Sequence, residues 1–255
     1  MQSSIVAKLL ALLTVISKTR APLTFSELVA ETGMNKSTLH RVLAISLEEQ
    51  LVQYDAHQKT YLMGAKVFDL VRGAHGGYDI QAVALGEMVR LHGAIDANVT
   101  LGVPNGMDVV YLRILESSSA VGAIQRPGMR EQVHCSAAGK ALMAFLPEAV
   151  IDTKLKDYEF IRHTERTIVD AAGFKAALKA VRAAGYATND REEYEHFLGI
   201  SAPIFNYMGD AIAVLNIWSV HPHHTMQDLT AWSPDLLAAT RRVTELIGGV
   251  APAAA

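Results

Sequence analysis

Cysteine is almost absent from this chain, because Cys135 is the only one among its 255 residues. A single thiol excludes an intramolecular disulfide and a cysteine-based zinc finger, and it suits a reducing compartment. The sequence also lacks the run of roughly 18 apolar residues that a membrane-spanning helix needs. The apolar stretch 5–16 contains Lys8 and precedes no cleavage-like site. We therefore expect a cytoplasmic protein that makes no membrane contact.

Positive charge is scarce as well. The 23 Lys and Arg residues are outnumbered by 26 Asp and Glu residues, which gives a formal net charge of −3. Nucleic-acid binding would therefore depend on local placement of basic side chains rather than on a global excess. No phosphate-binding glycine loop or other cofactor motif is present, so we expect no cofactor. The length and the 50% apolar content predict two domains with modest cores.

The first fifty residues contain three amphipathic helical patterns, the first over 5–16. Thr24 and Glu27 have the spacing of a capping box for a second helix, which ends near Gly33. Glycine can adopt the left-handed conformation that a tight turn needs. Asn35 is placed to cap a third helix that continues to Leu47. Two helices joined by a glycine-containing turn predict a helix-turn-helix.

Polar side chains occupy the beginning of the third predicted helix, which in a helix-turn-helix enters the major groove with its N-terminal residues foremost. The residues there that can donate to phosphates or base edges are Lys36, Ser37, Thr38, His40 and Arg41. The alternative is a solvated polar face without a function. Two β-rich runs, 51–54 and 60–62, surround a polar tip that ends at Lys59 and predict a wing. The wing favours DNA binding.

The predicted helix-turn-helix and wing carry little net charge. Residues 1–62 contain six Lys and Arg residues and five Asp and Glu residues, a net of +1. Affinity for DNA increases with the number of phosphates that are neutralised, so a single copy should bind weakly. We therefore expect a homodimer that reads two half-sites.

Several further motifs occur in a fixed order along the chain. The N-terminal motifs are Lys36-Ser37-Thr38-Leu39-His40-Arg41-Val42-Leu43 and Thr60-Tyr61-Leu62-Met63-Gly64. The later motifs are Ser136-Ala137-Ala138-Gly139-Lys140-Ala141, Phe145-Leu146-Pro147, Gly185-Tyr186-Ala187, Glu192-Glu193 and Ala202-Pro203-Ile204-Phe205. Together they resemble the IclR type of transcriptional regulators over nearly the whole chain.

The resemblance implies an α+β protein in which a winged helix-turn-helix over 1–63 is followed by a linker helix over 64–77 and a GAF-like α/β effector-binding domain over 78–250. It implies a regulator, not an enzyme, that binds double-stranded operator DNA and a small organic effector, often acidic or aromatic. It also implies homodimers, commonly paired into dimers of dimers. Three positions depart from the pattern of the family: Gln50 replaces a frequent glycine, Gly199 a cysteine and Asn206 an aspartate.

The C-terminal part also predicts a mixed fold without the resemblance. Helical spacing extends over 80–92 and beyond Asp170, and a closing helix is expected over 228–247. The β-rich runs 98–103 and 107–115 surround Pro104-Asn105-Gly106, a hairpin signal, and two more strands are expected over 200–205 and 211–220. Helices mixed with mainly antiparallel strands indicate an α+β sensor domain.

The resemblance also carries effector-binding roles to individual residues. A helix start at Ser136 offers free amides to a carboxylate, and the resemblance assigns pocket positions to the residues beside it, Ala137 and Ala138. Four further pocket positions fall on Asn189, Gly199, Asn216 and Trp218. Our hypothesis is a neutral-to-anionic organic ligand, for example an aromatic acid, that is recognised by both asparagines and stacks on Trp218. The alternative is that Trp218 fills the pocket or the core.

Three other signals carry less weight. His221-Pro222-His223-His224 resembles a metal cluster, but its proline and its place after a strand favour an exposed loop. Cys135 beside His134 could form a redox or nucleophilic site, although a buried cysteine is the simpler interpretation. The acidic run at Glu192, Glu193 and Glu195 could supply an acid pair, but a solvated loop explains it. We therefore expect no metal ligands and no catalytic residues.

Two classes of function remain from the sequence. The first is a ligand-responsive DNA-binding regulator, in which ligand alters the pairing of effector domains and the helix over 65–72 transmits the change to the spacing of the DNA-binding domains. The second is a metabolic enzyme or binding module in which the N-terminal helices only dimerise. The sequence leaves the operator, the effector and the sign of regulation open.

Overall fold

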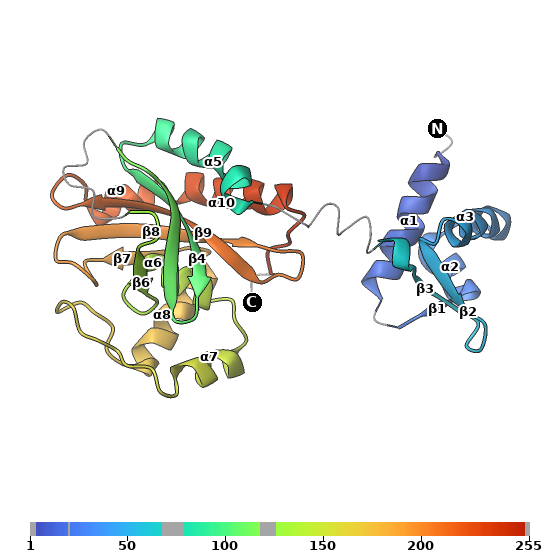
Figure 1. Ribbon diagram of the computed structural model, residues 1–255, viewed down its shortest axis with the longest axis horizontal. Helices are drawn as coiled ribbons and strands as arrows, with labels where there is room; N and C mark the ends of the chain where they lie inside the picture. Colours follow the sequence, from blue (N-terminus) through green and yellow to red (C-terminus); the bar gives the residue numbers. More distant parts are fainter. Residues whose placement is uncertain (1–3, 20, 68–78, 118–125, 253–255) are drawn as a thin grey trace. The chain divides into compact units, whose positions relative to one another are not determined.

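A computed structural model describes residues 4–19, 21–67, 79–117 and 126–252. The chain divides into two compact units, Met1–Tyr78 and Asp79–Ala255 (Figure 1). Among the described residues, no helix is long and apolar enough to cross a membrane.

The first unit contains three helices, and the second and third have the predicted caps. They are α1 (Ile5–Lys18), α2 (Phe25–Thr32) and α3 (Lys36–Glu48). Thr24 and Glu27 form the capping box of α2, and Gly33 ends it with a φ of 65°. The Asn35 side chain accepts a hydrogen bond from the Thr38 amide and caps α3. The helices bury one small core that includes Leu12, Leu28, Leu39, Val42 and Leu43.

A three-stranded sheet completes this unit. Its strands β1 (Leu23–Thr24), β2 (Val52–Asp55) and β3 (Thr60–Met63) lie in the antiparallel order β1-β3-β2. Gln50 lies between α3 and β2 with a φ of 57°, so this glutamine takes the left-handed conformation that glycine favours. A Cβ atom at Gly64 would lie 2.1 Å from the Gln50 carbonyl oxygen, so glycine is required at that close approach. The winged helix-turn-helix prediction is confirmed.

The second unit is organised by a six-stranded antiparallel sheet in the order β6-β5-β4-β9-β8-β7. The predicted hairpin consists of β4 (Asn98–Asn105) and β5 (Asp108–Leu115), with Gly106 in the turn at a φ of 67°. The other strands are β6 (Arg130–Gln132), β7 (Ala187–Asp190), β8 (Phe197–Phe205) and β9 (Ala211–Val220).

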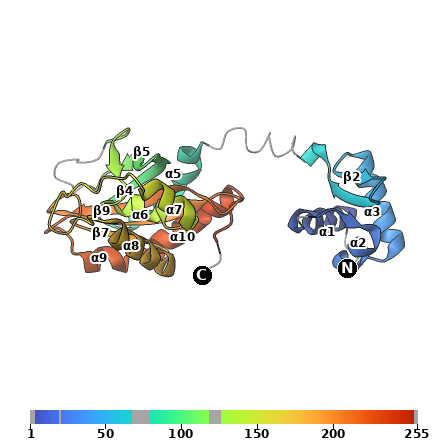
Figure 2. The ribbon, with the colours of Figure 1, turned by 90° about the horizontal axis from the view of Figure 1, so that it is seen from below.

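Helices cover both faces of this sheet (Figures 1 and 2). On one face, α5 (Ile80–Ala94), α9 (Met226–Ala231) and α10 (Ser233–Leu246) pack on Leu215 and Ile217 of β9. On the other face lie α6 (Ala137–Met143), α7 (Glu148–Leu155) and α8 (Ala171–Ala184), which share a core with Val214. Side chains alternate along a strand, so Asn216 and Trp218 face the α6 side.

The closing helix differs from its prediction over 228–247, because α9 and α10 are separate helices. Pro234 lies in the first turn of α10, and the residue before a proline is disfavoured in an α-helix. The helix α7 and the strands β6 and β7 have no counterpart among the elements predicted from the sequence. Within the predicted linker helix over 64–77, Gly64 is not helical and residues 65–67 are, while 68–77 lie outside the described residues.

Candidate functional site

The beginning of α3 presents the predicted polar row to solvent. Leu39, Val42 and Leu43 are buried and hold the helix in the unit. The side chains that are exposed on the opposite side are those of Lys36, Ser37, His40 and Arg41, whereas Thr38 is half-buried. The Ser37 hydroxyl donates to Asn35 Oδ1 at 2.9 Å, so the cap residue also orients the first turn. This arrangement suits insertion of the helix N-terminus into a groove.

Contacts and backbone conformation that the sequence did not predict position His40 and Lys59. The His40 ring packs on Phe25 of α2, with 4.4 Å between ring centroids. Lys59 is exposed at the tip of the wing and has a φ of 52°. Asp55 Oδ1 accepts hydrogen bonds from the His57 and Gln58 amides, which closes the tip. The wing therefore holds Lys59 in a defined turn.

The four predicted pocket residues of the second unit are all buried between the sheet and α6. Asn189 Nδ2 donates to the Cys135 carbonyl at 3.0 Å, and Asn189 Oδ1 accepts from the Glu192 amide at 2.9 Å. Both ends of this amide are therefore committed to the protein backbone. Asn216 Nδ2 donates to Thr100 Oγ1 at 3.2 Å. The role of these asparagines in ligand recognition stays a prediction.

Trp218 has a less complete set of contacts. Its ring is 1% exposed and stacks on Phe197, with 5.2 Å between centroids. Its Nε1 is buried and has no hydrogen-bond partner in the described part of the chain. A Cβ at Gly199 would lie 3.4 Å from Asn216 Oδ1, so the absence of a side chain there leaves room beside that amide. An unsatisfied buried donor is costly unless a ligand or water accepts from it.

Ala137 and Ala138 form the first turn of α6 and belong to the apolar core of its face. The predicted helix start at Ser136 is confirmed, because the Ser136 hydroxyl accepts from the Gly139 amide at 3.0 Å. That hydroxyl also donates to the Gln132 carbonyl. Whether these alanines touch an effector stays a prediction.

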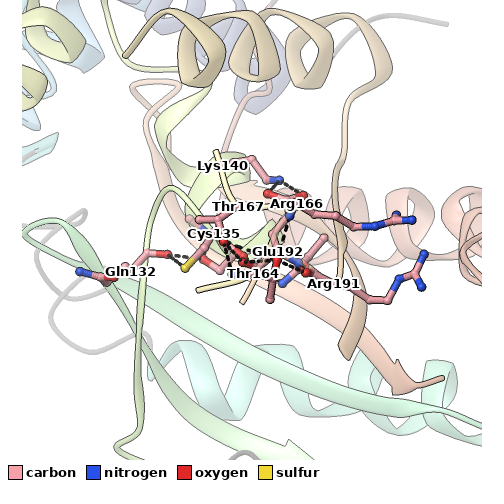
Figure 3. Close-up of polar contacts among 11 residues, drawn as sticks. Gln132, Cys135, Lys140, Thr164, Arg166, Thr167, Arg191 and Glu192 are labelled. Atoms are coloured by element: carbon pink, nitrogen blue, oxygen red, sulfur yellow. Dashed lines mark hydrogen bonds and ion pairs between the residues drawn. The ribbon is translucent and has the colours of Figure 1, made fainter. Parts of the chain in front are cut away.

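A buried ion pair fixes α6 to the loop between β7 and β8 (Figure 3). Lys140 Nζ lies 2.6 and 2.5 Å from the two carboxylate oxygens of Glu192. The hydroxyls of Thr164 and Thr167 donate to the carbonyls of Arg191 and Glu192, both at 2.7 Å. Burial raises the pKa of Glu192, while Lys140 opposes that shift. Lys140 and Glu192 each lie in a motif identified in the sequence, but the motifs did not predict that the two residues form a pair.

The solvated loop predicted for the acidic run is wrong at Glu192 and Glu193. Glu193 Oε2 is buried without a hydrogen-bond partner among the described residues. Burial, and then the charge of Glu131, raise the pKa of Glu193 to about 8. The carboxyl is therefore largely neutral at pH 7 and can donate a hydrogen bond. Glu195, in contrast, is exposed as predicted.

The histidine run and Cys135 were also candidates from the sequence. His221 and His223 are exposed after β9, as the loop interpretation predicted. Cys135 is fully buried, as expected, and burial raises the pKa of its thiol above the ordinary value. A cavity of about 450 Å³ lies between α8, α10 and the end of β8, near Arg182 and Arg241, and contains none of the six predicted effector residues.

Both units match the same group of known proteins. Residues 5–56 match the IclR helix-turn-helix domain, and residues 73–245 match the family described as the bacterial transcriptional regulator IclR C-terminal domain. The second match alone covers more than half of the chain. The protein belongs to the IclR family of transcriptional regulators.

Individual IclR-family relatives cover nearly the whole chain. The HTH-type transcriptional regulator BhcR of Paracoccus denitrificans is 30% identical over 237 residues, which are 90% of this chain and 81% of that protein. The crystal structure of a putative IclR regulator from Silicibacter sp. TM1040 has a TM-score of 0.80 at 24% identity and covers 98% of both chains. An IclR homologue from Microbacterium hydrocarbonoxydans, complexed with 4-hydroxybenzoate, has a TM-score of 0.59 at 22% identity, covering 96% of this chain and 99% of its own.

IclR-family membership confirms the resemblance in the sequence and the α+β fold with its N-terminal helix-turn-helix. It also establishes a transcriptional regulator rather than an enzyme. The alternative of a metabolic enzyme is therefore dropped.

Proposed function

We propose that this protein binds operator DNA through α3 and the wing and that a small organic effector changes this binding to control catabolic genes. The observation that carries the proposal is the exposed row at the start of α3, held outward by a buried apolar face. The proposed contacts are Lys36, Ser37, Thr38, His40, Arg41 and Lys59. Their chemistry fits phosphates and base edges.

A homodimer is the proposed DNA-binding species. The first turns of α1 expose Ile5, Val6 and Leu10, which are 39%, 59% and 58% accessible. An apolar surface of this kind favours association with a second copy. The small charge of the unit also requires two copies for firm binding, since each supplies only a few phosphate contacts. Pairing of dimers into tetramers is the second step of this proposal.

The proposed effector is a small molecule with an aromatic ring and a carboxylate or carbonyl group. Trp218 Nε1 and a protonated Glu193 are both buried donors without partners among the described residues, and they complement a hydrogen-bond acceptor. The complex of the Microbacterium homologue contains a compound with both features. The stacking surface would be Trp218, and the neighbouring positions would be Ala137, Ala138, Asn189, Gly199 and Asn216.

The first test is a gel shift with the upstream region of the neighbouring operon, with and without aromatic acids. We expect retarded DNA at low salt and a change in its affinity with an active effector. Absence of DNA binding by the full-length protein at low salt would overturn the proposal. Lys156→Ala, an exposed lysine in the second unit, is the control for a general loss of charge.

Calorimetric titration of the same acids tests the effector site. Trp218→Phe keeps a ring against Phe197 and removes only the N–H, so we expect weaker binding of ligands that carry an acceptor. Loss of one hydrogen bond of this kind costs about 0.5–1.5 kcal/mol. Unchanged affinity of every ligand for Trp218→Phe and Trp218→Ala would reject the role of Trp218.

A further inference from the structure

Three potential metal ligands converge beside the beginning of α6. His134 and Cys135 precede this helix, and His163 lies in the segment between α7 and α8. The ligand atoms of the three side chains all lie within 4.8 Å of one another, the one such group of histidine, cysteine and carboxylate ligands among the described residues. Thiolate sulfur and imidazole nitrogen are the preferred ligands of zinc.

His134 is held in the tautomer that a metal requires. Its Nε2 lies 2.9 Å from the Ile161 carbonyl, which can only accept, so Nε2 carries the proton. Its Nδ1 therefore has a lone pair and accepts from the Tyr158 hydroxyl at 2.7 Å. A backbone carbonyl that orients the second nitrogen is the usual outer partner of a histidine ligand.

Acidic side chains surround Cys135. Its thiol donates to the Gln132 carbonyl at 3.6 Å, and Glu193, Glu131 and Glu192 oppose a negative charge on sulfur when their carboxyl groups are ionised. The same surroundings attract a cation, since a bound metal ion would offset both the thiolate and the acidic neighbours. Lys140 opposes this attraction, but its charge is already paired with Glu192.

His163 gives this cluster access to solvent. His163 is exposed, and its Nε2 lies 3.0 Å from Gln132 Oε1, so the Gln132 side chain orients this ring. The backbone carbonyl of the same glutamine accepts from the Cys135 thiol. Figure 3 shows Gln132 next to the Cys135 sulfur. An ion could therefore enter at His163 without unfolding of the core.

We propose that the protein binds one zinc-like divalent metal ion through the Cys135 thiolate, His134 Nδ1 and an imidazole nitrogen of His163. The thiol proton leaves to solvent, and the Tyr158 hydroxyl gives up its hydrogen bond to His134. Three protein ligands leave a fourth tetrahedral position open to water or to another donor. The site adjoins α6, so its occupation would alter the same region in which the effector is proposed to bind, but it does not depend on that proposal.

Cobalt(II) substitution tests the site with unusual specificity, because Cys135 is the only cysteine of the chain. Full-length protein freed of metal is titrated with cobalt(II) and then with zinc(II). We expect one ion per chain, a near-ultraviolet thiolate-to-cobalt charge-transfer band, visible bands of a tetrahedral ion, and displacement of cobalt by zinc. Absence of stoichiometric binding, or binding without the charge-transfer band, would overturn the proposal.

Matched variants separate this site from other histidines. Cys135→Ser should abolish the charge-transfer band. His163→Ala removes a metal ligand and should weaken metal binding more than loss of a residue that only hydrogen-bonds to a ligand, which costs roughly 10–100-fold. Tyr158→Phe removes the hydroxyl that competes for His134 Nδ1 and should retain or strengthen binding. His223→Ala, an exposed histidine in the loop after β9, is the control. Weaker binding in His223→Ala with normal binding in His163→Ala would contradict the proposal. Circular dichroism verifies the fold of each variant.

Discussion

The two units of this protein use polar side chains in opposite ways. In the first unit, the side chains of Lys36, Ser37, His40 and Arg41 face solvent, and the preceding residue Asn35 caps the helix by accepting from the Thr38 amide. In the second unit, the polar side chains of Asn189, Glu192 and Asn216 are buried and paired between the sheet and α6. Under the proposed function, the first unit would bind DNA with a preformed surface, whereas the second would bind its effector in a buried interior.

The largest expected effect comes from breaking the buried ion pair in the second unit. Lys140→Met leaves the Glu192 carboxyl buried and without its partner, which should lower the free energy of unfolding by about 3–5 kcal/mol. Both tryptophans, Trp218 and Trp232, lie in this unit, so urea unfolding followed by tryptophan fluorescence reports on it. Lys156→Met on the surface is the control. Recovery in the double variant Lys140→Met/Glu192→Gln would support the pair, and a loss below about 1 kcal/mol for Lys140→Met would contradict it.

Glu193 should make the second unit less stable as the pH rises. Its pKa is raised from 4.5 to about 8 in the folded chain, so folding favours the protonated carboxyl. This contribution is complete below about pH 4.5 and is lost progressively towards pH 8 and above. Glu193→Gln should therefore increase the free energy of unfolding more at pH 9 than at pH 5, by about 1–3 kcal/mol. The exposed Glu195→Gln is the control, and a pH-independent difference for Glu193→Gln would refute this account.

A smaller effect is expected in the first unit, where the cap of α3 lies on the surface. Asn35→Ala removes the acceptor of the Thr38 amide and should cost about 1 kcal/mol. Because no tryptophan lies in this unit, the change should appear in amide hydrogen exchange of α3 and leave the tryptophan transition unchanged. Ser37→Ala keeps the cap and should cost less. An equal cost in both variants would mean that the cap does not organise the helix.

The difference between the units also explains what the sequence could predict. The caps, the turns and the wing of the first unit depend on contacts between residues that are close in the sequence, such as Thr24 and Glu27. The predictions for these features are confirmed. The interior of the second unit depends on pairs such as Lys140 and Glu192, which are far apart in the sequence. Local patterns therefore predicted a solvated loop where the chain forms a buried ion pair. Burial also commits both ends of the Asn189 amide, which sequence alone left free for a ligand.

The most direct test of the account is the salt dependence of DNA affinity for the full-length protein and for Arg41→Ala. Fluorescence anisotropy with a labelled upstream fragment gives the slope of log affinity against log salt. We expect a steep negative slope that becomes shallower by about 2 in Arg41→Ala, since a dimer would lose one phosphate contact in each half-site. An unchanged slope together with unchanged affinity would contradict the claim that the start of α3 binds DNA.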